Sequence, residues 1–137
     1  MIVADASVIL KWVLPGEAGE EKAASLRAQH VAGARRIAVP VLLFYEVANT
    51  LALTERLPAD AAREALLAIA GSQLVSYSPS VEDLQRAAEL ARQCRITAYD
   101  AAYIALAEAL QCDFVTADAR LANKVRGADL GCCVRVL

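Results

Sequence analysis

Short apolar runs alternate with segments of helical pattern along the chain, and this alternation limits the fold more than any other feature. The runs that predict strands cover residues 2–4, 37–39, 74–77, 113–116 and 133–137. The segments between them have the length and apolar spacing of helices. Strands separated by helices form parallel sheets that are covered on both faces. We therefore expect a single domain over residues 1–137, a three-layer α/β/α sandwich with a five-stranded parallel sheet.

The residues at the ends of the helical segments indicate where each helix starts or stops. The predicted helices cover residues 8–14, 17–29, 40–54, 57–71, 80–94, 97–110 and 119–125. Ser7 is expected to cap the first helix, and Pro40 suits the first turn of the third. Gly71 is expected to end the fourth in the C′ position. Ser80 opens a capping box for the fifth, and Thr97 begins the sixth.

Four acidic residues stand alone in stretches that otherwise carry almost no charge: Asp5, Glu46, Asp100 and Asp118. Burial of an unpaired carboxylate costs several kcal/mol, and few basic residues lie near these acids. A bound metal ion would compensate all four. Because ligands in open parallel sheets bind beyond the carboxyl ends of the strands, Asp5 and Asp118 are expected to meet there. Glu46 and Asn49 share one face of a helix that should be buried, because it is apolar nearly all round.

Each acid also has a structural alternative. Asp100 is positioned as the third residue of a helix that Thr97 would cap, and Asp118 as an N-cap. Asp5 is compatible with a turn after a strand, whereas the mid-helix Glu46 has no capping role. Ligands that are all oxygen favour Mg²⁺ or Mn²⁺ over zinc, and carboxylate-held magnesium suits phosphate chemistry.

Composition and charge exclude several other classes of protein and of active site. The net charge of −2 gives no global basic field, so nucleic acid would have to meet a local patch. The four cysteines form no C-x-x-C pair, and no signal peptide is evident, which favours reduced thiols in a cytoplasmic protein. Polar residues interrupt the apolar stretch 37–54, so no membrane span is expected. His30 is the single histidine, which excludes a Ser-His-Asp triad, and Asp5-Ala6-Ser7 lacks the paired acid of a phosphotransfer domain.

Four segments, in order, resemble the motifs of the PIN domain, and more narrowly of the VapC-type toxin ribonucleases of bacterial and archaeal toxin–antitoxin pairs. They cover residues 2–7, 46–51, 97–103 and 116–121. The resemblance implies that Asp5, Glu46, Asp100 and Asp118 form the catalytic, metal-binding site, with Asp5 and Asp100 as direct ligands of Mg²⁺ or Mn²⁺. It also implies that Ser7, Asn49 and Thr116 bond to the carboxylates or to ordered waters.

The family resemblance further implies endonucleolytic cleavage of RNA by water, which leaves a 5′-phosphate and a 3′-hydroxyl. It implies a homodimer and a cognate antitoxin that inserts a segment across the site. The many apolar side chains of residues 41–70 would serve either the dimer contact or the antitoxin contact. Basic residues that flank the motifs are candidate RNA contacts: Lys11, Arg95, Arg120, Lys124 and Arg126. The alternatives are a stand-alone RNA-processing nuclease and a catalytically weak module that binds RNA or a partner.

Overall fold

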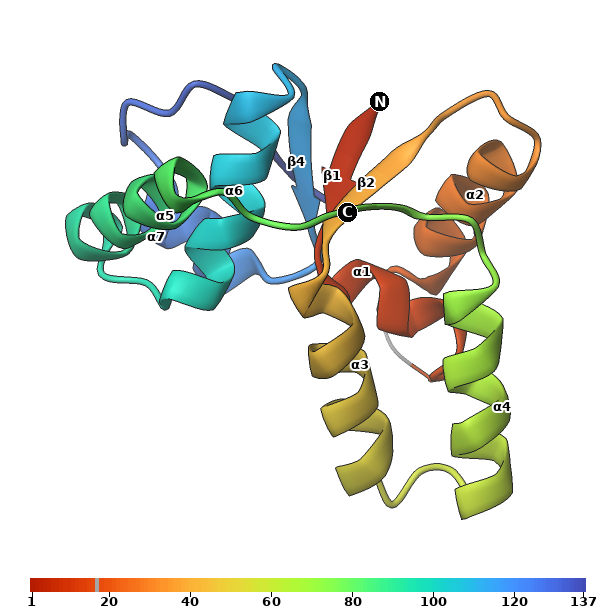
Figure 1. Cartoon of the computed structure of the whole chain (residues 1–137). Coiled ribbons are helices and arrows are strands. Elements are labelled where there is room, and N and C mark those ends of the chain that lie inside the picture. Colours follow the sequence, from red (N-terminus) through yellow and green to blue (C-terminus); the bar gives the residue numbers. More distant parts are fainter. Residues whose placement is uncertain (17) are drawn as a thin grey trace.

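The computed structural model describes residues 1–16 and 18–137, and within them a five-stranded parallel sheet lies between two sets of helices (Figure 1). The strands are β1 (Ile2–Ala4), β2 (Ile37–Pro40), β3 (Val75–Tyr77), β4 (Asp113–Thr116) and β5 (Val134–Val136). Their order in the sheet is β3-β2-β1-β4-β5, and every pair is parallel. The expected α/β fold is confirmed.

The order of the strands reverses at β1. From this central strand the chain adds β2 and β3 on one side and β4 and β5 on the other. Ile2 is in register with Ile37 of β2 and with Asp113 of β4. All residues of β1 and β2 are buried, as in a sheet covered on both faces. The carboxyl end of β1 is therefore the switch point at which such sheets bind ligands.

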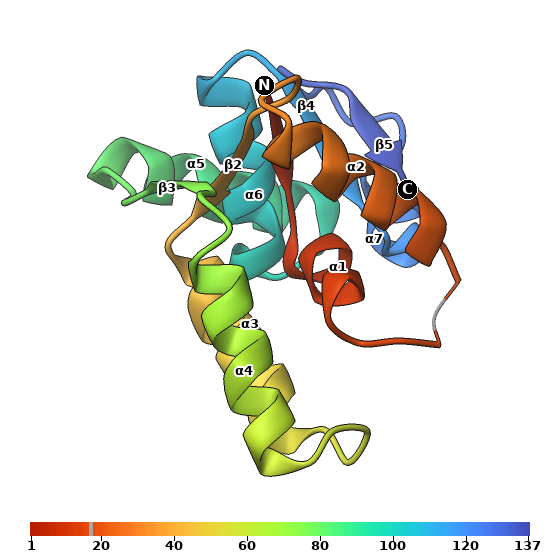
Figure 2. The same cartoon turned by 90° about the vertical axis from the view of Figure 1, so that its right-hand side faces the viewer.

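Helices cover both faces of the sheet and extend beyond one end of it. They are α1 (Ala6–Ile9), the 3₁₀ turn η1 (Leu10–Trp12), α2 (Glu20–Val31), α3 (Leu42–Leu53), α4 (Ala59–Ala70), α5 (Val81–Cys94), α6 (Ala98–Ala109) and α7 (Ala119–Val125). Figure 1 shows α5, α6 and α7 on one side of the sheet and α1 and α2 on the other. Helices α3 and α4 project together as an arm, which Figure 2 shows from the side. No helix among the described residues is both long and apolar enough to cross a membrane.

Several boundaries differ from the expectation, each for a local reason. Asp5, not Ser7, caps α1, because the Asp5 carboxylate accepts the backbone N–H of Val8. Pro40 is the last residue of β2 and not the first turn of a helix. Gly71 does end α4, but with a φ of −81° that any residue adopts.

The second and third helices also depart from the pattern. The start expected at Glu17 lies outside the described residues, and α2 is observed from Glu20 to Val31. Burial of α3 on all sides was expected and is not found, since only its Leu43, Val47 and Leu51 face is buried. The end of α3 projects beyond the sheet beside α4, and Leu53 there is 75% exposed.

Candidate acidic active site

Asp5 lies at the switch point of the sheet, directly after β1, and its side chain is only 7% exposed. Its Oδ1 accepts a hydrogen bond from the Ser7 hydroxyl (2.5 Å) and one from the Val8 backbone N–H (3.2 Å). Burial raises the pKa of Asp5, while the hydroxyls of Ser7 and Thr116 act in the opposite direction. The carboxylate is therefore held by donors, and burial makes its negative charge costly.

Hydroxyl groups join the carboxyl ends of β1 and β4. Ser7 Oγ accepts the backbone N–H of Ala117 (2.8 Å) and lies 3.4 Å from Thr116 Oγ1. Thr116 is fully buried, and its Oγ1 accepts the backbone N–H of Asp118 (2.9 Å). Ser7 and Thr116 thus connect the loop that carries Asp5 with the loop that carries Asp118.

Glu46 reaches the same region from the second turn of α3, where its side chain is half-buried. Its Oε2 accepts a short hydrogen bond from the hydroxyl of Tyr103, which lies on α6. Burial raises the pKa of Glu46, and the negative charges of Asp5 and Asp100 raise it further against the effect of Tyr103. Asp5 and Asp100 are therefore both close enough to Glu46 for their charges to act on it.

Asp100 is the third residue of α6 and combines two roles. Thr97 caps the helix by accepting the Asp100 backbone N–H (3.0 Å), and the Thr97 hydroxyl donates to Asp100 Oδ2 (2.8 Å). Thr97 therefore caps the helix, but the Asp100 carboxylate bonds to the Thr97 hydroxyl and not to its backbone N–H, so the expected capping box is not completed. The same Asp100 side chain acts on Glu46 through its charge. Capping does not exclude a role in the site.

Asp118 lies on the exposed flank of the site. It caps α7, since its Oδ1 accepts the backbone N–H groups of Arg120 (2.7 Å) and Leu121 (3.1 Å). The carboxylate lines a depression of about 530 Å³ together with Ser7, Lys11 and Arg120. The structure brings Asp5, Glu46 and Asp100 together, and it links Asp118 to them through Thr116.

The other candidate residues are distributed unevenly. Lys11 and Arg120 line the depression beside Asp118. Three further cations are exposed outside it, Arg95 after α5 and Lys124 and Arg126 at the end of α7. Asn49 is exposed on the projecting arm, and the structure describes no hydrogen bond between it and Glu46.

One oxygen of each acid is bound to a donor of the protein itself: Asp5 Oδ1, Glu46 Oε2, Asp100 Oδ2 and Asp118 Oδ1. Among the described residues, no three acidic, histidine or cysteine side chains already converge as metal ligands. Each carboxylate turns toward its own donor, which separates the like charges.

The donor set nevertheless fits a hard divalent cation. All the candidate ligands are oxygens, the type that Mg²⁺ and Mn²⁺ prefer. Within the described residues, none of the ion pairs involves these four acids. The charges of Asp5 and Asp100 act on a half-buried Glu46, and a cation placed between them would relieve that repulsion.

Tyr103 was not identified as a site residue from the sequence. The feature that could have identified it is its position, one turn after Asp100 in an otherwise apolar helix. A tyrosine buried there needs a hydrogen-bond partner for its hydroxyl. The partner, Glu46, is 57 residues away, so spacing alone does not reveal it. Thr50, which lines the depression from α3 one turn after Glu46, was missed for the same reason.

Comparisons with known proteins agree with this architecture. The model of the PIN domain matches residues 2–127. The chain is 37% identical over 126 residues to the VapC ribonuclease Mb0985 of Mycobacterium bovis and to the ribonuclease VapC9 of Mycobacterium tuberculosis, with 90% of each chain covered.

Two solved structures show the same fold at lower identity. PAE2754 from Pyrobaculum aerophilum superposes with a TM-score of 0.68 at 23% identity, covering 97% of this chain and 89% of that one. VapBC2 from Rickettsia felis, bound to a DNA fragment from its promoter, superposes with a TM-score of 0.70 at 14% identity. The match covers 100% of this chain and 99% of that one. With the family model matching nearly its whole length, the chain belongs to the PIN domain family.

Proposed function

We propose that this PIN-domain protein is a Mg²⁺- or Mn²⁺-dependent endoribonuclease. The observation that carries the proposal is the half-buried Glu46 near the switch point of the sheet, on which the charges of Asp5 and Asp100 both act. None of the ion pairs in the described part of the chain involves these three acids. The relatives at 37% identity, which are named ribonucleases, support hydrolysis of RNA. Endonucleolytic cleavage of a phosphodiester is the chemistry that an all-oxygen site of this kind serves.

In this proposal Asp5 and Asp100 hold the metal directly, and Glu46 and Asp118 complete the acidic site. When bound, the metal supplies an activated water and neutralises charge on the phosphoryl oxygens. The protein's own contribution is orientation. Ser7 and Thr116 fix Asp5 and its surroundings, and the loop ends that they join keep Asp118 on the rim.

Positive charge for the substrate lies on the same flank as Asp118. Lys11 and Arg120 line the depression there, where the phosphates of a single-stranded RNA would pass. Each phosphate contact should make binding sensitive to salt. The slope of the logarithm of the binding constant against the logarithm of the salt concentration is about −0.7 per contact for a single strand.

Replacement of Arg120 by Ala should therefore weaken RNA binding and reduce the salt slope. An unchanged slope would remove Arg120 from the proposed contacts.

The decisive experiment replaces single ligands with isosteric amides. Asp100→Asn and Asp5→Asn should lower Mg²⁺-dependent cleavage of a structured RNA, such as a tRNA, by roughly 100-fold or more while the fold is retained. Asp60→Asn, an exposed aspartate on α4, is the matched control and should cleave at the parental rate. Cleavage at the parental rate by Asp100→Asn would refute the assignment.

The same assay separates the enzyme from a binding module. A module that only binds RNA would show stoichiometric binding without divalent-dependent turnover. Titration calorimetry with Mn²⁺ gives an independent check, because Asp5→Asn should lose most of the heat of binding. Absence of binding by the parental protein at millimolar Mn²⁺ would count against the mechanism.

A toxin role in a type II toxin–antitoxin pair follows from the relatives, which carry the VapC name. The proposed partner is an antitoxin with an apolar segment. The arm of α3 and α4 offers it exposed side chains, since Leu53 is 75% and Leu67 is 62% exposed. Expression should arrest growth, and Asp100→Asn should relieve the arrest. A neighbouring gene for a small DNA-binding protein would support the pair, whereas its absence would favour a stand-alone processing nuclease.

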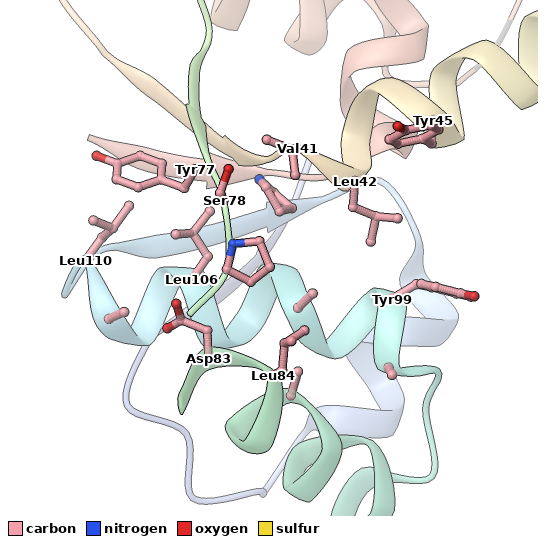
Figure 3. Close-up of a pocket in the computed structure, with 16 residues that line it drawn as sticks. Val41, Leu42, Tyr45, Tyr77, Ser78, Asp83, Leu84, Tyr99, Leu106 and Leu110 are labelled. Atoms are coloured by element: carbon pink, nitrogen blue, oxygen red, sulfur yellow. The ribbon is translucent and has the colours of Figure 1, made fainter. Parts of the chain in front are cut away.

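A homodimer is proposed on a different surface, an apolar groove of about 450 Å³ on the side of the sheet that α5 and α6 cover. Figure 3 shows that its lining side chains come from the start of α3, from the end of β3 and from α5 and α6. Three of its residues are well exposed, Tyr45 at 77%, Tyr99 at 64% and Leu84 at 55%. An exposed apolar patch rich in tyrosine is typical of a protein interface.

A reducing cytoplasm is the proposed compartment. Cys94, Cys112, Cys132 and Cys133 are all free thiols in the structure, as expected where disulfides do not persist. Fractionation of the native cells would test this, and recovery of the protein from an oxidising compartment would contradict it.

A further inference from the structure

Tyr103 joins the hydrophobic core to the acidic site. It lies on α6, one turn after Asp100, and only 2% of its surface is exposed. Its ring stacks on Phe114 of β4, with the ring centres 6.3 Å apart and the planes at 26°. Because the core fixes the ring, the position of the hydroxyl is also fixed.

The hydroxyl of Tyr103 makes its polar contacts at the acidic site, with the carboxylate of Glu46 and with the backbone N–H of Ala6, the residue after Asp5. It donates to Glu46 Oε2, and this bond connects α6 with α3 across 57 residues of sequence. Phenylalanine would fill the same space in the core, so packing alone does not require the oxygen. A phenol hydroxyl ordinarily keeps its proton at neutral pH, so the group is a hydrogen-bond donor.

We propose that Tyr103 is a positioning residue of the acidic site, which anchors Oε2 of Glu46 and leaves Oε1 as the oxygen available to a cation or a water. This inference rests on the proposed nuclease function and refines it. Half-buried Glu46 has a flexible side chain, and the hydrogen bond from a rigid donor selects one orientation of it. Glu46 then serves the site with one oxygen, in contrast to a bidentate ligand.

The test removes the hydroxyl and keeps the ring. Tyr103→Phe should lower Mn²⁺ affinity, measured by titration calorimetry, by about 10-fold, as loss of a group that orients a ligand typically does. Its kcat for RNA cleavage should fall while the KM for RNA stays the same. Ser25→Ala is the control, because it removes a hydroxyl at an exposed position of α2, a helix that carries none of the four acids. That control should retain parental Mn²⁺ affinity and kcat.

A purely structural role would give a different pattern. Tyr103→Phe would then change the melting temperature but leave Mn²⁺ affinity and kcat at parental values, and that outcome would overturn the proposal. Glu46→Asp provides a second route if Tyr103→Phe folds poorly, since the shorter side chain withdraws from the hydroxyl. It should reproduce the loss of Mn²⁺ affinity, and adding Tyr103→Phe to it should cause no further loss.

A full further loss in the double variant would show that Tyr103 does not act through Glu46. The parental protein separates this result from a failure of the nuclease proposal. Absence of Mn²⁺ binding by the parental protein would refute the nuclease mechanism, and the role of Tyr103 with it. Parental binding that Tyr103→Phe leaves unchanged would refute the role of Tyr103 alone.

Discussion

The orientation of each acidic side chain is set by hydrogen-bond donors within the protein. Ser7 fixes Asp5, Tyr103 fixes Glu46, and Thr97 fixes Asp100. A side chain that is ordered before a ligand arrives avoids an ordering cost of about 0.5–1.5 kcal/mol on binding. The donors therefore favour cation binding even though the carboxylates repel one another.

A different acid, Glu108, shows how a carboxylate behaves when a protein cation is present. Arg86 donates to it through Nε (2.7 Å) and Nη2 (3.0 Å), and the Gly131 backbone N–H donates as well (2.9 Å). Glu108→Gln should reduce the free energy of unfolding by about 1 kcal/mol, because Arg86 is partly exposed. Urea denaturation measures the change. Glu89→Gln is the control, since Glu89 is exposed and lies 3.5 Å from the same Arg86.

The contribution of Glu108 should also depend on pH. Burial alone would raise its pKa, but the hydrogen bonds from Arg86 and Gly131 lower it below the ordinary value of 4.5. A carboxyl with a lowered pKa stabilises the fold fully above its unfolded value, and this stabilisation is lost as the pH falls through the folded value. The difference between the parental protein and Glu108→Gln should therefore narrow as the pH falls below 4.5. An equal difference at neutral and acid pH would contradict the ion pair.

The sequence singled out the candidate acids and, through the family resemblance, Ser7 as a donor to Asp5, but it did not single out Tyr103 as the donor to Glu46. Glu46 and Asp100 stand out because their neighbours carry no charge, and this is visible in one dimension. The bond between Tyr103 and Glu46 depends on how two distant helices pack, and no local pattern encodes it. The exposure of Asn49 could not be predicted either, because it depends on where the sheet ends and α3 projects beyond it.

At the scale of secondary structure, three residues that start helices belong to the candidate acidic site or bond to one of its acids. Asp5, Thr97 and Asp118 cap α1, α6 and α7, and these helices begin at or near the carboxyl end of the sheet. The N-terminus of a helix carries partial positive charge, which favours an acidic side chain there. The capping and the metal-binding hypotheses therefore do not compete, because one carboxylate has an oxygen for each.

Substitutions of Asp118 should separate these two roles. Asp118→Ala removes the cap of α7 and should reduce the free energy of unfolding by about 1 kcal/mol. Asp118→Asn keeps a hydrogen-bond acceptor and should reduce the free energy of unfolding by only about a few tenths of a kcal/mol. Both should lower Mg²⁺-dependent cleavage if the charge serves the site. Ser80→Ala, which removes the cap of α5, should lose stability but keep its activity. Parental activity in Asp118→Asn would restrict Asp118 to capping.

Helix periodicity predicted the elements well and their exposure poorly. The span of α7 and the capping box of α5 agree with expectation, because the signals are local. The apolar pattern of α3 suggested a buried helix, yet Leu53 is exposed on the arm. An apolar surface that faces a partner has the same composition as one that faces a core.

At the scale of the whole molecule, the sheet order determines which segments meet. Alternation of strands and helices predicted parallel strands, but it does not state that β1 lies between β2 and β4. That order places Asp5 beside Thr116, which lies 111 positions later in the sequence. None of the four acids lines the apolar groove, so dimer formation can be tested without replacing them.

The apolar groove predicts a two-fold dimer in which each copy presents the same surface. Leu84→Asp places a charge in the groove and should weaken self-association by roughly 100-fold, since a buried charge without a partner costs several kcal/mol. Val81→Asp is the matched control, because Val81 is exposed on the same turn of α5 but does not line the groove.

Sedimentation equilibrium at micromolar protein should show a dimer for the parental chain and for Val81→Asp, and a monomer for Leu84→Asp. The acids lie outside the groove, so the Leu84→Asp monomer should still bind Mn²⁺ with the affinity of the parental protein. A parental protein that stays monomeric at these concentrations, or a Leu84→Asp variant that dimerises equally well, would show that a second copy does not occupy the groove. The exposed arm of α3 and α4 would then be the remaining surface for contact between copies.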